Sequence, residues 1–335
     1  MKNRKYKIII SIFIVLLIMS IAISFMTGNY SMKILDVIST LSGNGNKYQE
    51  FTLYQLRLPR IVLAILVSFA LATSGVILQA ITKNPLAEPG MIGINAGAAL
   101  FVVVFISLGT NTYYSSLAQS SKFMIPFVAI AGSIFAAVIA YTLAYKGKIS
   151  PVRFVLCGIG LNAGINAIIT FYQLNISKGD FNQVLTWTNG SLWGSSWDYI
   201  IPASPFIIIL IVFTFCRHKI LDLLYLGDEI SVGLGISLTK ENIIFIITAT
   251  LLAGVATSVA GNIAFLALLG PRIAKKLVGN RHIFLIPLSG TIASIILVLS
   301  DIIARTVFSP IEIPVGIVVS IVGIPYYLYL IRKKS

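Results

Sequence analysis

The sequence predicts an all-α integral membrane protein with about ten membrane-spanning helices. Of its 335 residues, 57% are hydrophobic and only 11% are charged, whereas a soluble domain carries about a quarter charged residues. The apolar residues form long unbroken runs, without the alternation that is typical of a membrane β-barrel. Because backbone groups in hydrocarbon must be hydrogen-bonded within their own segment, such runs indicate helices.

Ten apolar segments are candidate spans. A bilayer core about 30 Å thick needs about 20 helical residues per crossing. The eighth candidate is the shortest, and the ten are residues 8–27, 59–81, 91–109, 123–145, 152–172, 198–216, 241–261, 263–278, 283–305 and 314–331. They predict a single transmembrane domain over residues 1–335.

The basic residues predict the orientation. With a cytoplasmic N-terminus, all but seven of the 25 lysines and arginines fall inside, as the positive-inside rule requires. The exceptions are Lys33, Lys47, Arg57, Arg60, Lys122, Lys178 and Arg305. Both termini are therefore expected in the cytoplasm, and the basic start is read as the flank of an uncleaved first helix rather than as a signal peptide. The net charge of +14 then reflects membrane topology and not nucleic-acid binding.

Motifs for energy coupling and catalysis are missing from the sequence. No phosphate-binding loop with a G-x-x-x-x-G-K-[ST] pattern occurs, so ATP hydrolysis by this chain is not expected. All acidic residues lie in joints or near span ends, whereas a proton-coupled carrier buries one in a span. Cys157, Cys216 and the two histidines lack metal-site spacing, and no catalytic set of an intramembrane enzyme is found. A secondary carrier remains the rival to a transporter that a partner drives.

Three arginines lie on the outer side, against the charge bias. Arg57 and Arg60 flank Pro59, which is expected to begin the second span, and Arg305 ends the ninth. Each arginine on its own could extend to lipid phosphates. Together they favour a basic rim that docks an acidic surface of an extracellular protein. Asp301 stands four residues before Arg305 and is expected to pair with it on one helix face.

The longest cytoplasmic joint, about residues 217–240, predicts a compact knob. Asp228 and Glu229 are favourable at the start of a short helix, and Gly233 and Gly235 allow a tight turn after it. Such a knob suits a groove on a cytoplasmic protein, and a solvated connector is the alternative.

A second joint, between the second and third spans, contains two prolines that prevent a continuous helix. Small-x-x-x-small pairs that allow close helix approach follow it in the third and fifth spans, at Gly93 with Gly97 and at Gly160 with Gly164.

In order along nearly the whole chain, these segments resemble the iron-siderophore and cobalamin permease family, the FecCD type of type II ABC importers. The residues that carry the resemblance are Arg57-Leu58-Pro59-Arg60, Ser74-Gly75 with Gln79, Asn84-Pro85-Leu86-Ala87-Glu88-Pro89 with Gly93 and Gly97, Leu226-Gly227-Asp228-Glu229 with Leu234-Gly235, Ala260-Gly261 with Ile263 and Phe265, and Pro314-Val315-Gly316 with Gly323-Ile324-Pro325. The family's Gly-Leu-x-x-Pro-His-x-x-Arg stretch departs here, where residues 267–275 have Arg272 in place of the histidine.

The resemblance implies a permease subunit in a bacterial cell membrane, without a cofactor or metal of its own. Its implied partners are a second permease subunit, identical or related, a cytoplasmic ATPase that holds ATP and Mg, and an extracellular lipoprotein that binds the substrate. It assigns binding-protein docking to Arg57, Arg60 and Arg305. It assigns ATPase coupling to Leu226, Gly227, Asp228, Glu229, Ser231, Gly233, Leu234 and Gly235.

The remaining expectations concern the path and the cargo. We expect roles in helix packing or the translocation path for Gln79, Asn84, Pro85, Gly93, Gly97, Gly160 and Gly164. The stretch from Trp187 to Trp193 resembles siderophore permeases, which favours an iron(III)-siderophore complex, of the hydroxamate type, over haem or cobalamin.

Overall fold

The computed structural model describes residues 2–28, 30–109, 119–146, 148–149, 151–175, 185, 187–307, 309 and 311–332. These residues form a helical bundle with one short antiparallel hairpin, in which Tyr145 lies opposite Ile149. The elements are α1 (Lys2–Met26), α2 (Ile34–Leu41), α3 (Lys47–Glu50), the π-helical η1 (Phe51–Arg57), α4 (Leu58–Thr82), the 3-10 turn η2 (Gly90–Ile92), α5 (Ile94–Gly109), α6 (Gln119–Ala144), β1 (Tyr145–Lys146), β2 (Lys148–Ile149), α7 (Pro151–Asn175), α9 (Trp197–Cys216), α10 (His218–Leu226), α11 (Asp228–Gly233), α12 (Leu238–Ala260), α13 (Leu266–Val278), α14 (His282–Thr306) and α15 (Val315–Arg332).

The predicted all-α membrane fold is confirmed. Within the described residues, seven helices are long and apolar enough to cross a membrane, and two shorter apolar helices occupy the third and tenth predicted spans. The eighth predicted span is α13, which has 13 residues and is therefore about 20 Å long. This helix is shorter than a hydrocarbon core of about 30 Å.

The short α13 results from a break in the chain after α12. Gly261 has φ +68°, and Phe265 has φ +64°, so the helix cannot continue through these residues. The exposed backbone groups of the break are paired by the segment before α9, because Asn262 N donates to Trp187 O at 3.2 Å and Ser191 N donates to Ala260 O at 2.8 Å. These bonds allow a non-helical segment to lie inside the bundle.

Pro59 lies in the first turn of α4, as predicted, but helical backbone also precedes it. One helix of 36 residues runs from Lys47 to Thr82 and contains the π-helical η1 just before the proline. Leu58 N donates to Leu53 O, five residues earlier, and this wider turn relieves the clash that a proline ring causes in an α-helix. Tyr54 O, which Pro59 cannot bond, accepts a hydrogen bond from the Trp197 indole at 3.0 Å.

Glycines set the closest helix contacts in the core. A Cβ on Gly75 of α4 would lie 1.9 Å from Ala267 O of α13, and a Cβ on Gly97 of α5 would lie 2.4 Å from Gly132 O of α6. Gly97 therefore packs as predicted. Gly160 and Gly164 have no described atom within 4 Å of an added Cβ, and the close approach of α7 is made by Gly158 instead.

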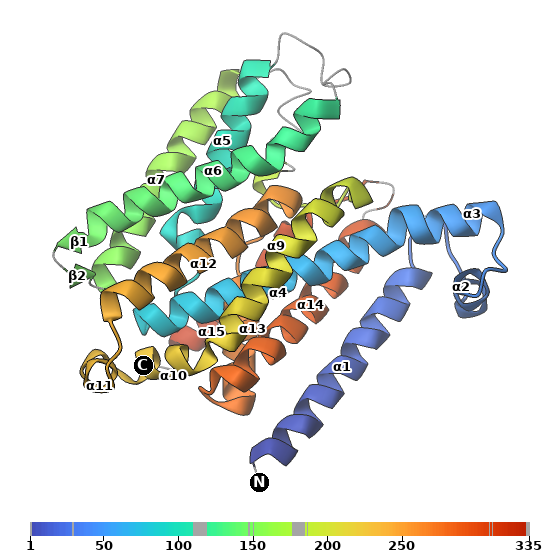
Figure 1. Cartoon of the computed structure of the whole chain (residues 1–335). Helices are drawn as coiled ribbons and strands as arrows, with labels where there is room; N and C mark the ends of the chain where they lie inside the picture. The colour runs from blue at the N-terminus through green and yellow to red at the C-terminus, as the bar shows by residue number, and fades with distance from the viewer. Residues whose placement is uncertain are drawn as a thin grey trace.

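The elements that carry the predicted sites lie at two ends of the bundle (Figure 1). We call the end with Arg57, Arg60 and Arg305 the arginine end, and the end with α10 and α11 the knob end. Helix α1 packs along α14, and the N- and C-termini both lie at the knob end (Figure 1). The common placement of the termini agrees with an even number of crossings.

Candidate functional site

At the arginine end, two arginines hold the carboxyl end of α1. The Arg57 guanidinium donates to the carbonyls of Phe25 and Tyr30, and Arg305 Nη2 donates to Ser24 O at 2.7 Å. The last carbonyls of a helix lack partners within it, and positive charge is favourable there. Arg57 is 4% exposed and Arg305 is 7% exposed, so both guanidinium groups are buried and bind groups within the bundle.

Arg60 ties three segments of this end together. Its Nε lies 2.7 Å from Asp301 Oδ1 on α14, and its Nη1 lies 2.8 Å from Glu312 Oε2 on the segment before α15. The predicted pair of Asp301 with Arg305 is present but longer, with 3.6 Å between Arg305 Nε and Asp301 Oδ2. The closer partner, Arg60, and the second carboxylate, Glu312, were not found from the sequence because both contacts are remote along the chain.

The three arginines thus lie together, as predicted, but they face inward. The side chain of Arg60 is 12% exposed, and its partners Asp301 and Glu312 are 4% and 27% exposed. Docking of a binding protein through these arginines stays a prediction. The structure adds the requirement that a partner's acidic group compete with Glu312 or with the α1 carbonyls.

The knob forms as the sequence predicts, with α10 and α11 separated by Gly227. Asp228 and Glu229 lie in the first turn of α11, and Gly235 has φ +81° in the turn that follows. The buried Ser231 hydroxyl donates within the knob, to Leu223 O at 2.9 Å or Gly227 O at 2.8 Å. Four large apolar side chains are at least half exposed on this small unit, namely Leu226, Ile230, Val232 and Leu234.

Polar contacts connect the knob to the spans. Lys83 follows α4, and its Nζ lies 2.6 Å from Asp228 Oδ1. Asp222 Oδ1 of α10 accepts a hydrogen bond from the His282 backbone N–H at 2.8 Å and lies 2.6 Å from His282 Nδ1. The Asp222 carboxylate thereby caps the first turn of α14. Burial alone would raise the pKa of the Asp222 carboxyl, but its hydrogen bonds with His282 outweigh burial and hold that pKa below its usual value.

Gln79, Asn84 and Pro85 lie where α4 leads to the knob end. Gln79 is buried and its Nε2 has no partner among the described residues. It borders a space of about 10 Å³ next to Tyr225 and His282, which is about the size of one water molecule. Asn84 Oδ1 accepts Leu86 N at 3.0 Å and so shapes the turn that contains the half-buried Pro85.

A polar group at the α12–α13 break was missed in the sequence. The carboxyl of Glu88 accepts a hydrogen bond from the backbone N–H of Phe265, and burial raises the pKa of Glu88 to about 7 despite this bond. Asn95 Nδ2 donates to Asn262 Oδ1 at 2.9 Å nearby. The only sequence signal was the family-like motif that contains Glu88. Among the described residues, no group of three or more His, Cys, Asp or Glu side chains could hold a metal ion.

Known proteins are similar to this chain over nearly its full length. The iron(3+)-hydroxamate import system permease protein FhuG of Bacillus subtilis is 41% identical and covers 100% of this chain and 99% of its own. The Fe(3+)-citrate import system permease protein YfmE of Bacillus subtilis is 37% identical, with 100% and 97% covered. A solved structure, described as an inward-facing conformation of a metal-chelate type ABC transporter, has a TM-score of 0.84 at 24% identity and covers 97% of this chain and 99% of that one. The model of the FecCD transport family matches residues 16–333, and the chain therefore belongs to this family.

Proposed function

We propose that this chain is the permease subunit of an ATP-binding-cassette importer and that its cargo is an iron(III)-siderophore complex of the hydroxamate class. The observation that carries the proposal is the full-length match at 41% identity to a permease named for iron(3+)-hydroxamate import. Other relatives are named for Fe(3+)-citrate or for siderophores. More relatives therefore support an iron complex as the cargo than support the hydroxamate class. A haem or cobalamin permease of the same family is the alternative.

We further propose that a separate ATPase binds the knob. Leu226 and Leu234 are 61% and 62% exposed at an end of the protein that faces water, and exposed apolar patches of this kind mark interaction sites. This assignment makes the knob end cytoplasmic. It agrees with the many basic residues there and with the two termini at that end.

Helix α14 is our candidate for the link between the two ends. Its first turn is held by Asp222 of the knob, and its last turns carry Asp301 and Arg305. A displacement of the knob by the ATPase would thus reach the arginine end through one continuous helix. At that end we propose that a binding protein docks, with an acidic group replacing Glu312, the more exposed partner of Arg60.

The knob assignment is tested by changing one exposed leucine at each end. Leu234→Asp should abolish co-purification of the ATPase, because it places a charge in the apolar contact. Leu35→Asp is the matched control, since Leu35 is 72% exposed on α2 at the arginine end, and it should leave co-purification unchanged. Equal retention of the ATPase by both variants would refute the knob as its site.

The cargo and the energy source are tested in proteoliposomes that contain the permease, ATPase and binding protein. Uptake of labelled iron(III)-hydroxamate should exceed uptake of haem or cobalamin and should stop when the ATPase is inactivated. Preferred uptake of haem or cobalamin would favour the alternative cargo. Uptake that persists with an inactive ATPase would instead identify a secondary carrier.

A further inference from the structure

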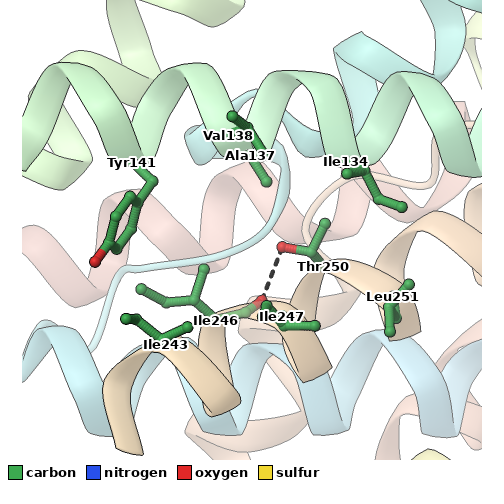
Figure 2. Close-up of a pocket in the computed structure, with 9 residues that line it drawn as sticks. All are labelled: Ile134, Ala137, Val138, Tyr141, Ile243, Ile246, Ile247, Thr250 and Leu251. Carbon is green, nitrogen blue, oxygen red and sulfur yellow. Dashed lines mark hydrogen bonds between the residues drawn. The ribbon is translucent and has the colours of Figure 1, made fainter. Parts of the chain in front are cut away.

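An apolar groove runs along the flank of the bundle between α6 and α12 (Figure 2). Its volume is about 350 Å³, within the range of about 300–1,000 Å³ that small-molecule sites have. The Thr250 hydroxyl in the groove is already used, because it donates to Ile246 O at 2.8 Å. The principal lining residues are Ile134, Val138 and Tyr141 of α6 and Ile243, Ile247 and Leu251 of α12.

The groove is open and lies between two helices that are long and apolar enough to cross a membrane. On its rim, Val138 is 54% exposed and Ile247 is 52% exposed. An empty groove would leave its walls without dispersion contacts on one side. Apart from the hydroxyls of Thr250 and Tyr141, the lining is apolar, so a hydrocarbon chain is the occupant that fits.

Charge at one end of the groove indicates the headgroup. Lys240 precedes Ile243 by three residues and Ile247 by seven, so it lies on the same face of α12 at the knob end. It is exposed and makes no ion pair within the part of the chain that the structure describes. At the same end, Tyr141 stacks on Tyr145 with 5.8 Å between ring centroids, and such aromatic residues are typical of the membrane interface.

We propose that this groove binds one acyl chain of an anionic phospholipid whose headgroup is held by Lys240. The apolar walls take the chain, the tyrosines lie at the depth of the ester groups, and the lysine neutralises the phosphate. Anionic lipids enriched on the cytoplasmic side attract basic groups next to spans in the same way.

The acyl chain is tested with purified full-length protein and native mass spectrometry. Protein exchanged into an equal mixture of phosphatidylglycerol and phosphatidylcholine is washed with a mild detergent, and the retained lipids are counted. Val138→Trp fills the groove and should retain one phosphatidylglycerol fewer than the wild type. Val212→Trp on α9 is the matched control, because Val212 is 52% exposed and lies outside the groove, and it should behave as the wild type. Ile247→Trp gives the same test from α12 should Val138→Trp not fold.

The headgroup is tested with a second matched pair. Lys240→Gln should lower the preference for phosphatidylglycerol over phosphatidylcholine several-fold, whereas Lys219→Gln, an exposed lysine of α10 at the same end, should not. Equal lipid counts for Val138→Trp and the wild type would overturn the proposal, as would a wild type that retains both lipids equally. A change of oligomeric mass in Val138→Trp would also overturn it, because the groove would then be a protein interface.

Discussion

Replacing Arg60 by glutamine separates two roles of the arginine end. If Arg60 chiefly ties the bundle together, Arg60→Gln removes the guanidinium that lies 2.7 Å from Asp301 and leaves a carboxylate that is only 4% exposed. Removing one partner of a buried ion pair costs about 3–5 kcal/mol. Arg305 Nε remains 3.6 Å from the same carboxylate, so we expect the lower end of this range, about 3 kcal/mol.

Two control variants test whether the cost comes from the buried charge of Asp301. Replacing both partners, as Arg60→Met with Asp301→Leu, should recover part of the loss, because the buried Asp301 carboxylate is removed together with its partner. Recovery is not complete, because Arg305 loses the carboxylate that lies 3.6 Å from its Nε and Glu312 loses Arg60. Glu312→Gln removes the partner whose side chain is 27% exposed, and we expect a cost of about 1 kcal/mol or less. The double variant therefore tests burial of charge rather than loss of packing.

The measurement is the free energy of unfolding of the purified protein in mild detergent, from a denaturant titration. Association with the binding protein is measured in parallel in reconstituted membranes. An Arg60→Gln variant whose unfolding free energy changes by less than about 0.5 kcal/mol, the range of ordinary surface substitutions, would refute the structural role. Loss of association with unchanged stability would support direct docking instead.

Two further predictions concern the core. Gly75→Ala should lower the free energy of unfolding by about 3 kcal/mol or more, because its Cβ would meet Ala267 O at 1.9 Å, whereas Gly160→Ala in open space should be neutral or slightly stabilising; equal effects in a denaturant titration would contradict this contact. Burial raises the pKa of Glu88 from 4.5 to about 7, so the folded state binds this proton more tightly than the unfolded state. The contribution of Glu88 to stability is then greatest at acidic pH and falls by up to about 3 kcal/mol as pH rises from about 4.5 to about 7. Glu88→Gln should remove that part of the decline in unfolding titrations at pH 5 and pH 8, and an unchanged decline would show that Glu88 does not cause it.

Local features of the structure were predictable from the sequence. The spans follow from runs of apolar residues, and α11 follows from Asp228, Glu229 and the glycines after them. A break between α12 and α13 was predicted, since separate spans end at residue 261 and begin at residue 263. Its pairing with Trp187 and Ser191 was not, because these residues come from another part of the chain. Pro59 indicated the start of α4 correctly, but it did not reveal the π-helical η1 that precedes α4.

The sequence by itself determined that the chain crosses a membrane many times and which joint forms the knob, since both depend on composition and neighbouring residues. Tertiary structure decided which side chains meet, as in the ion pair of Arg60 with Asp301, which lies 241 positions away. It also decided that Gly158, and not Gly160, packs against its neighbour. The physical reason is that lipid and protein interior are both apolar, so a membrane helix has no strong contrast between its faces to reveal which one is buried.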